Sequence, residues 1–137
     1  MQNFLTKGSV CFVTLDMGFG GAEKVIATLA NEFIQSGRAV TILTLIDQND
    51  FIHALDSRVK LQTLSIKNFK MSFFTLCKFI YKNKFDNFIA NIWPLTVFSF
   101  LVRLVSPKTN LIYIEHCILS EQYRDKNIFF KIFQKIS

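Results

Sequence analysis

The segment DMGFGGAEK, residues 16–24, decides the fold because it joins a run of apolar residues to a long amphipathic segment. The apolar run, residues 9–15, is typical of a buried strand, and the segment from residue 22 repeats its apolar residues at helical spacing. The glycines between them allow a tight strand-to-helix turn, so the first N–H groups of the helix point at whatever lies in front of that turn. This geometry suits an anion, most often a phosphate.

The rest of the chain continues the alternation of strand and helix. We expect the first helix to end at Gly37, a polar linker at residues 47–56, further strands at 39–45, 59–64, 87–92 and 110–115, and further helices at 70–82, 94–105 and 124–136. Strands that are apolar on both faces and alternate with helices form a parallel sheet with helices on both sides. The sequence therefore predicts one α/β, Rossmann-like domain, whose ligands bind outside the carboxyl ends of the strands.

The glycine turn differs from two common phosphate-binding motifs. A Gly-x-Gly-x-x-Gly fingerprint that begins at Gly18 would need its third glycine at position 23, where the chain has Glu23, and a Walker sequence is also missing. An NAD-dependent oxidoreductase is thereby disfavoured, although Asp47 follows the second strand, as the ribose-binding acid does in that class. A turn that only reverses the chain is the structural alternative.

Charge and cysteine usage narrow the classes of partner. The 137 residues carry a net charge of +6, but the sixteen Lys and Arg residues are dispersed. This favours an anionic membrane or a phosphorylated small molecule over nucleic acid. Cys11, Cys77 and Cys117 lack Cys-x-x-Cys spacing, which is typical of reduced cytoplasmic thiols. No metal site is expected, because ligand spacing is missing around His53 and His116.

The predicted helix at residues 70–82 combines a core stripe with a mixed outer face. Leu76, Cys77 and Ile80 fall on the core side, and the outer face carries Lys70, Phe74, Lys78, Tyr81 and Lys82. Aromatic residues among lysines suit a membrane interface, here the inner face of the plasma membrane. Two alternatives remain open: scattered exposed apolar residues without a role, and a face that packs on another domain.

Four segments together resemble the amino-terminal domain of family 4 glycosyltransferases. They are GFGGAEKV at 18–25 with ATLA at 27–30, GRAVT at 37–41, FDNFIA at 85–90, and LIYIEH at 111–116. The resemblance implies a two-domain GT-B enzyme that moves a sugar from a nucleotide-diphosphate donor with retention of configuration and without a metal. The acceptor would be a glycan or a lipid-linked saccharide of surface polysaccharide, lipopolysaccharide or glycan biosynthesis.

The resemblance also assigns roles to individual residues. Gly18, Gly20 and Gly21 would face the donor diphosphate, His116 would be the catalytic residue in the donor-sugar pocket, and Glu115 and Glu23 would contact acceptor or sugar. The nucleotide-binding carboxy-terminal domain of the family is missing from these 137 residues. We therefore expect an incomplete amino-terminal domain, inactive by itself. The alternative is a non-catalytic remnant that binds a membrane or a partner protein.

Overall fold

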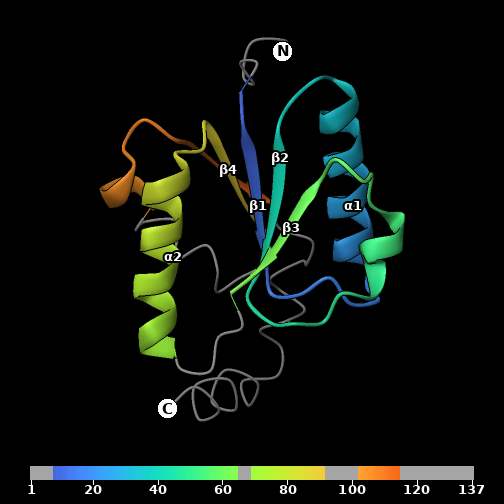
Figure 1. Ribbon diagram of the computed structural model, residues 1–137, viewed down its shortest axis with the longest axis horizontal. Helices are drawn as coiled ribbons and strands as arrows, with labels where there is room; N and C mark the ends of the chain where they lie inside the picture. Colours follow the sequence, from blue (N-terminus) through green and yellow to red (C-terminus); the bar gives the residue numbers. More distant parts are fainter. Residues whose placement is uncertain (1–7, 65–68, 92–101, 115–137) are drawn as a thin grey trace, which may run out of the picture.

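Five parallel strands form one sheet in the computed structural model. The structure describes residues 8–64, 69–91 and 102–114. In the helix that begins at residue 69, side chains are described from residue 74 onward. The strand order is β3-β2-β1-β4-β5, and every neighbouring pair is parallel (Figure 1). The strands are β1 (Val10–Thr14), β2 (Val40–Thr44), β3 (Lys60–Thr63), β4 (Asn87–Asn91) and β5 (Asn110–Ile114). The predicted α/β, Rossmann-like class is confirmed.

Helices cover both faces of this sheet. α1 (Gly21–Gln35) lies on one side and α2 (Phe69–Asn83) on the opposite side (Figure 1). The linker expected at residues 47–56 contains a short 3-10 helix, η1 (Asp50–Ala54), that the sequence analysis did not predict. Of the helices predicted at 94–105 and 124–136, only residues 102–105 are described, and these are helical.

The core consists of two clusters, one on each face of the sheet. Successive side chains of a strand point to opposite faces. In β1, Val10 and Phe12 therefore join the cluster under α1, and Cys11 and Val13 join the cluster under α2. All five residues of β1 are buried. Each fully buried large aliphatic or aromatic side chain contributes about 1.5–3 kcal/mol, so the central strand is anchored from both sides.

The helices present slightly different faces from those predicted. In α2, Leu76 and Ile80 are buried as expected, but Phe79 is the third buried residue of the stripe and Cys77 is only partly buried. The buried side of α2 therefore lies nearer to Phe79 than the sequence analysis predicted, and Cys77 lies at its edge.

Both long helices end in a residue with left-handed backbone. Gly37 has φ +83°, and the N–H groups of Gly37 and Arg38 donate to the carbonyls of Ile34 and Phe33, which is the Schellman arrangement. The predicted stop at Gly37 is confirmed. α2 is also followed by a left-handed residue, Lys84 with φ +46°, but here a single bond, from the N–H of Lys84 to the carbonyl of Ile80, closes the helix. Glycine would be the less strained residue at this position.

Candidate functional site

The carboxyl edge of the sheet is the candidate site because the order in which the chain adds strands reverses there, between β1 and β4. After β1 the chain passes through α1 to β2 on one side, and after β3 it returns through α2 to β4 on the other side of β1. The space between the ends of β1 and β4 is therefore the topological switch point, where open parallel sheets bind their ligands. The glycine turn follows β1 at this point.

Backbone hydrogen bonds fix the glycine turn to the loop that follows β2. The N–H of Met17 donates to the carbonyl of Gln48 at 2.8 Å, and the N–H of Phe51 donates back to the carbonyl of Met17 at 2.8 Å. The Met17 side chain is fully buried. The turn is thus part of the packed structure and reaches the start of α1 in a defined position.

The three glycine positions of the turn differ in whether the structure requires glycine there. The N–H of Gly18 donates to Oδ1 of Asp16 at 2.9 Å, and a Cβ at Gly18 would lie 3.0 Å from Nε2 of Gln48, so this glycine serves the turn itself. Gly20, the N-cap residue, is extended, with φ −157° and ψ 167°. Gly21 is exposed, and a Cβ there would have nothing within 4 Å. Neither packing nor backbone conformation requires glycine at position 21, and the space around its Cβ position is open.

Glu23 lies in front of this helix start. Its carboxylate is in contact with the position that a Cβ on Gly20 would occupy. The first N–H groups of α1 have no intrahelical acceptors, and Gly20 offers no side-chain cap. A carboxylate in the first turn of a helix is stabilised by the positive end of the helix dipole. Glu23 therefore occupies the place where an incoming anion would bind.

A row of polar side chains crosses the carboxyl edge, and we call it the carboxyl row. Its members are the last residues of β3, β2, β1 and β4, namely Thr63, Thr44, Thr14 and Asn91. Thr14 is paired with Thr44, Thr44 with Thr63, and the pairing of Val13 with Ala90 brings Thr14 beside Asn91. By strand alternation the row lies on the α1 face, in line with Leu61, Ile42, Phe12 and Ile89.

One half of the carboxyl row is satisfied and the other half is not. The hydroxyls of Thr44 and Thr63 share a hydrogen bond of 2.8 Å. Thr14 and Asn91 are fully buried, yet Oγ1 of Thr14 and both amide atoms of Asn91 have no hydrogen-bond partner among the described residues. A buried polar group without a partner costs about 1–3 kcal/mol. Two buried side chains whose polar atoms lack partners among the described residues therefore call for a bound water or a ligand.

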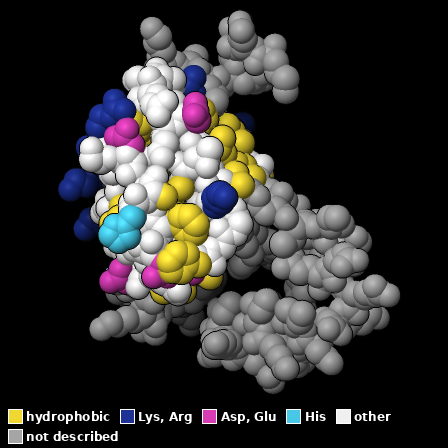
Figure 2. Space-filling model, turned by 90° about the vertical axis from the view of Figure 1, so that its right-hand side faces the viewer, with side chains coloured by type: hydrophobic (Ala, Val, Ile, Leu, Met, Phe, Trp, Pro, Cys, Tyr) yellow, Lys and Arg dark blue, Asp and Glu magenta, His cyan; other side chains and the backbone are white. Residues whose placement is uncertain are grey.

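Exposed apolar side chains border the glycine turn, and we call them the apolar rim. They belong to the turn, the loop after β2 and η1, and they are Leu15, Phe19, Ile46 and Ile52. Phe19 is 83% exposed, and its ring lies 5.6 Å from the ring of Phe51. Figure 2 looks onto the side with α1 and η1, where hydrophobic side chains gather in the lower half beside acidic ones.

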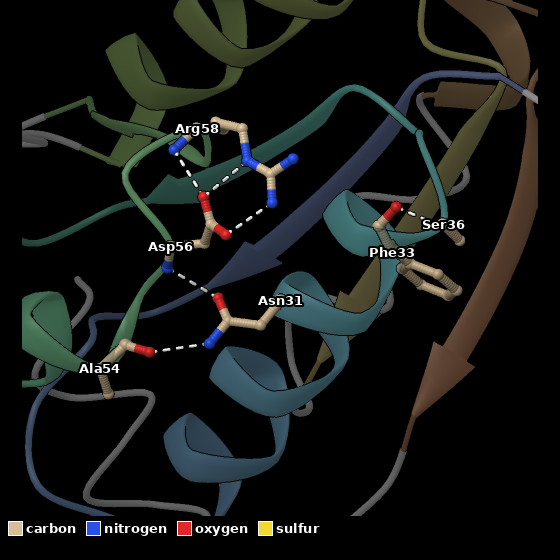
Figure 3. Close-up of polar contacts among 6 residues, drawn as sticks. All are labelled: Asn31, Phe33, Ser36, Ala54, Asp56 and Arg58. Carbon is tan, nitrogen blue, oxygen red and sulfur yellow. Dashed lines mark hydrogen bonds and ion pairs between the residues drawn. The ribbon is translucent and has the colours of Figure 1, made fainter.

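Asn31 holds the η1 segment against α1 (Figure 3). Its Nδ2 donates to the carbonyl of Ala54 at 2.8 Å, and its Oδ1 accepts from the N–H of Asp56 at 2.8 Å. Arg58 in turn makes two side-chain hydrogen bonds to the Asp56 carboxylate and holds its pKa at about 2. We call the contacts of Asn31 with Ala54 and Asp56 the polar clamp, and they hold the end of η1, which carries Ile52 of the apolar rim.

The structure describes only some of the residues that the sequence analysis selected. Gly18, Gly20, Gly21 and Glu23 come together at the turn. Glu115 and His116 lie outside the described residues, although β5 ends at Ile114, paired with Asn91 of the carboxyl row. Phe74, Lys78, Tyr81 and Lys82 are exposed on α2, and the side chain of Lys70 lies outside the described part.

The described part offers little for metal or thiol chemistry. Among residues 8–64, 69–91 and 102–114, no three His, Cys, Asp or Glu side chains gather as metal ligands would. Burial raises the pKa of Cys11, and partial burial raises that of Cys77, so both thiols are poor nucleophiles. None of the helices in these ranges has the length and hydropathy that crossing a bilayer requires.

Sequence reasoning missed the carboxyl row. A usable signal was present in three of the four strands, because VCFVT, VTILT and NFIAN each end on Thr or Asn directly after apolar residues. The sequence was also compared with models of protein families and with curated proteins, and neither comparison finds a match.

Proposed function

We propose that this chain is the acceptor-side domain of a retaining glycosyltransferase, which moves a sugar from a nucleotide-diphosphate donor to a glycan or lipid-linked acceptor. The observation that carries the proposal is the start of α1 at the switch point of the sheet, where the Cβ position of Gly21 has nothing within 4 Å. Backbone N–H groups at a helix start bind phosphate groups well. The resemblance of the four segments to family 4 glycosyltransferases supports the same reading.

The proposed chemistry needs negative charge to be stabilised where it develops. In retaining transfer the leaving diphosphate gains negative charge while the sugar gains positive charge. N–H groups at Gly20 and Gly21 would meet the diphosphate, and a fixed set of donors loses no energy to reorganisation during the reaction. His116 would position the donor sugar, with Glu115 and Glu23 near acceptor or sugar. This division of roles requires no metal.

The apolar rim supports an acceptor that carries an apolar part. Phe19 is strongly exposed directly beside the glycine turn, and exposed apolar groups near a polar site suit an amphipathic ligand. A lipid-linked saccharide has this character. The outer face of α2, with Phe74, Lys78, Tyr81 and Lys82, would then hold the protein at the anionic cytoplasmic face of the plasma membrane.

A transfer assay on the intact protein tests the proposal. Radiolabelled UDP-, GDP-, ADP- and dTDP-sugars are offered with soluble saccharides and with extracted lipid-linked acceptors. We expect label in an acceptor from one donor class, and no transfer by residues 1–137 alone. Binding to anionic vesicles without transfer from any donor by the intact protein would contradict the enzyme and favour a non-catalytic binding module.

A further inference from the structure

We infer that Thr14 and Asn91 form a subsite for an uncharged, polyhydroxylated ring, the sugar of the acceptor; this rests on the proposed function. The pair sits at the ends of neighbouring strands, on the α1 face, at the switch point between β1 and β4. Their three polar atoms, which lack partners in the described part of the chain, belong to adjacent residues of the carboxyl row. No other function described above uses them.

The chemistry of the two side chains selects the ligand. The Asn91 amide supplies an acceptor oxygen and an N–H donor pair, and the Thr14 hydroxyl both donates and accepts. Adjacent hydroxyls of a sugar ring present the same mixture of donors and acceptors. The carboxyl row contains only neutral side chains, so it provides no charge to attract an anion. The diphosphate is instead assigned to the start of α1.

The rest of the row serves as an internal comparison. Thr44 and Thr63 occupy equivalent strand ends, and their hydroxyls bond each other. Only the half that faces the switch point lacks partners among the described residues. Both Thr14 and Asn91 are closed off from solvent, so the inference requires that the carboxyl edge opens locally before a sugar hydroxyl can contact them.

The competing explanation is a buried water that satisfies these atoms permanently. The two explanations predict opposite effects of an apolar replacement on stability. Thr14→Val keeps the shape of the side chain and removes the hydroxyl. If the hydroxyl is unpaired in the free protein, its removal stabilises the fold; if a water pairs with it, its removal leaves that water unsatisfied and destabilises the fold.

The experiment measures stability and sugar binding on the same variants of this chain. Thr14→Val and Asn91→Leu are compared with Thr41→Val, a threonine of β2 away from the carboxyl edge. Unfolding is followed in urea, and binding of glucose and of N-acetylglucosamine at millimolar concentrations is followed by amide chemical shifts. We expect Thr14→Val to raise the urea midpoint and weaken sugar binding roughly tenfold, as the loss of about one hydrogen bond does, with binding unchanged in Thr41→Val.

Three results would overturn the inference. They are a lower urea midpoint in Thr14→Val, which indicates a structural water; unchanged sugar binding in Thr14→Val; and no sugar binding by the unmodified chain. The urea midpoint and the sugar affinity of Asn91→Leu test the other residue of the pair by the same criteria. The proposed function is judged separately, by sugar transfer from nucleotide donors, so failure of the subsite and failure of the transferase activity give different outcomes.

Discussion

The carboxylate of Glu23 lies at the position that a Cβ on Gly20, the N-cap residue of α1, would occupy. This contact satisfies the positive end of the helix dipole with a group that belongs to the chain itself. An anionic ligand must displace the carboxylate before it can bind at the same place. We therefore expect the Glu23 carboxylate to lower the affinity of the free protein for anions.

Glu23→Gln should strengthen the binding of pyrophosphate. A charge at a helix end is worth about 0.3–1 kcal/mol, so the affinity should rise roughly two- to fivefold. Isothermal titration with pyrophosphate at low salt measures the change. Glu32→Gln removes the same charge near the other end of α1 and is the control. Equal gains in the two variants would indicate a general effect of net charge and contradict the competition at the turn.

Gly21→Val and His116→Ala should each lower kcat/KM of sugar transfer in the intact protein by at least about tenfold, or ~1.4 kcal/mol of transition-state stabilisation. A valine at position 21 fills the open space that the diphosphate would use, and loss of His116 removes the group that positions the donor sugar. Initial rates at low donor concentration measure the change, with circular dichroism as the check on folding. Near-normal transfer by both folded variants would contradict the site.

A triple variant should no longer bind vesicles that contain phosphatidylglycerol when Lys70, Lys78 and Lys82 of this chain are all changed to Glu. A lysine near an acidic surface contributes about 1 kcal/mol, and the reversal also adds repulsion. Co-sedimentation at low salt measures binding. Lys24, Lys60 and Lys108 changed to Glu alter the net charge equally and lie outside α2. If both triple variants lose binding alike, the α2 face has no special part in it.

Gly37→Ala should destabilise the protein by about 1 kcal/mol, because residue 37 has positive φ. Lys84→Gly should stabilise it by up to about 1 kcal/mol for the same reason at the end of α2. Lys84→Ala removes the charge but keeps the strained backbone and should give no gain. Urea midpoints of the three variants test this, and a gain in Lys84→Ala equal to that in Lys84→Gly would assign the effect to charge.

Asn31→Ala should lower the free energy of unfolding by about 1–2 kcal/mol. Two hydrogen bonds, to the carbonyl of Ala54 and from the N–H of Asp56, are lost together. Thr28→Ala on the same helix removes only an exposed hydroxyl and should change stability by less than about 0.5 kcal/mol. Chemical denaturation measures both. Equal stability of the two variants would show that the polar clamp contributes nothing.

The strands and long helices could be predicted because apolar periodicity and glycine position are local signals. The run at residues 9–15 became β1 with one residue fewer at each end, and Gly37 ends α1 as expected. η1 could not be predicted, because its conformation is held by groups distant in the chain, the Asn31 amide and the Met17 carbonyl. Tertiary contacts decide such segments.

The candidate site divides in the same way. Gly21 could be selected from the sequence because a strand-to-helix turn identifies it. The contact of Glu23 with Gly20 depends on a side-chain rotamer, which no pattern encodes. The positions of Thr14 and Asn91 at the ends of apolar segments are visible in the sequence. Their significance comes from the lack of hydrogen-bond partners among the described residues. That property exists only once the neighbouring strands are in register.

The rate at which the Cys11 thiol is labelled reports how often the central strand opens. Its thiol is fully buried in β1 between two neighbouring strands, and burial raises its pKa, so a thiol reagent must wait until the sheet separates. In a Cys77→Ser, Cys117→Ser background, the rate of Cys11 labelling relative to that of a free thiol then equals the fraction of molecules with an open core. Cys11 thus serves as a natural probe of β1, the strand whose carboxyl end lies at the candidate site.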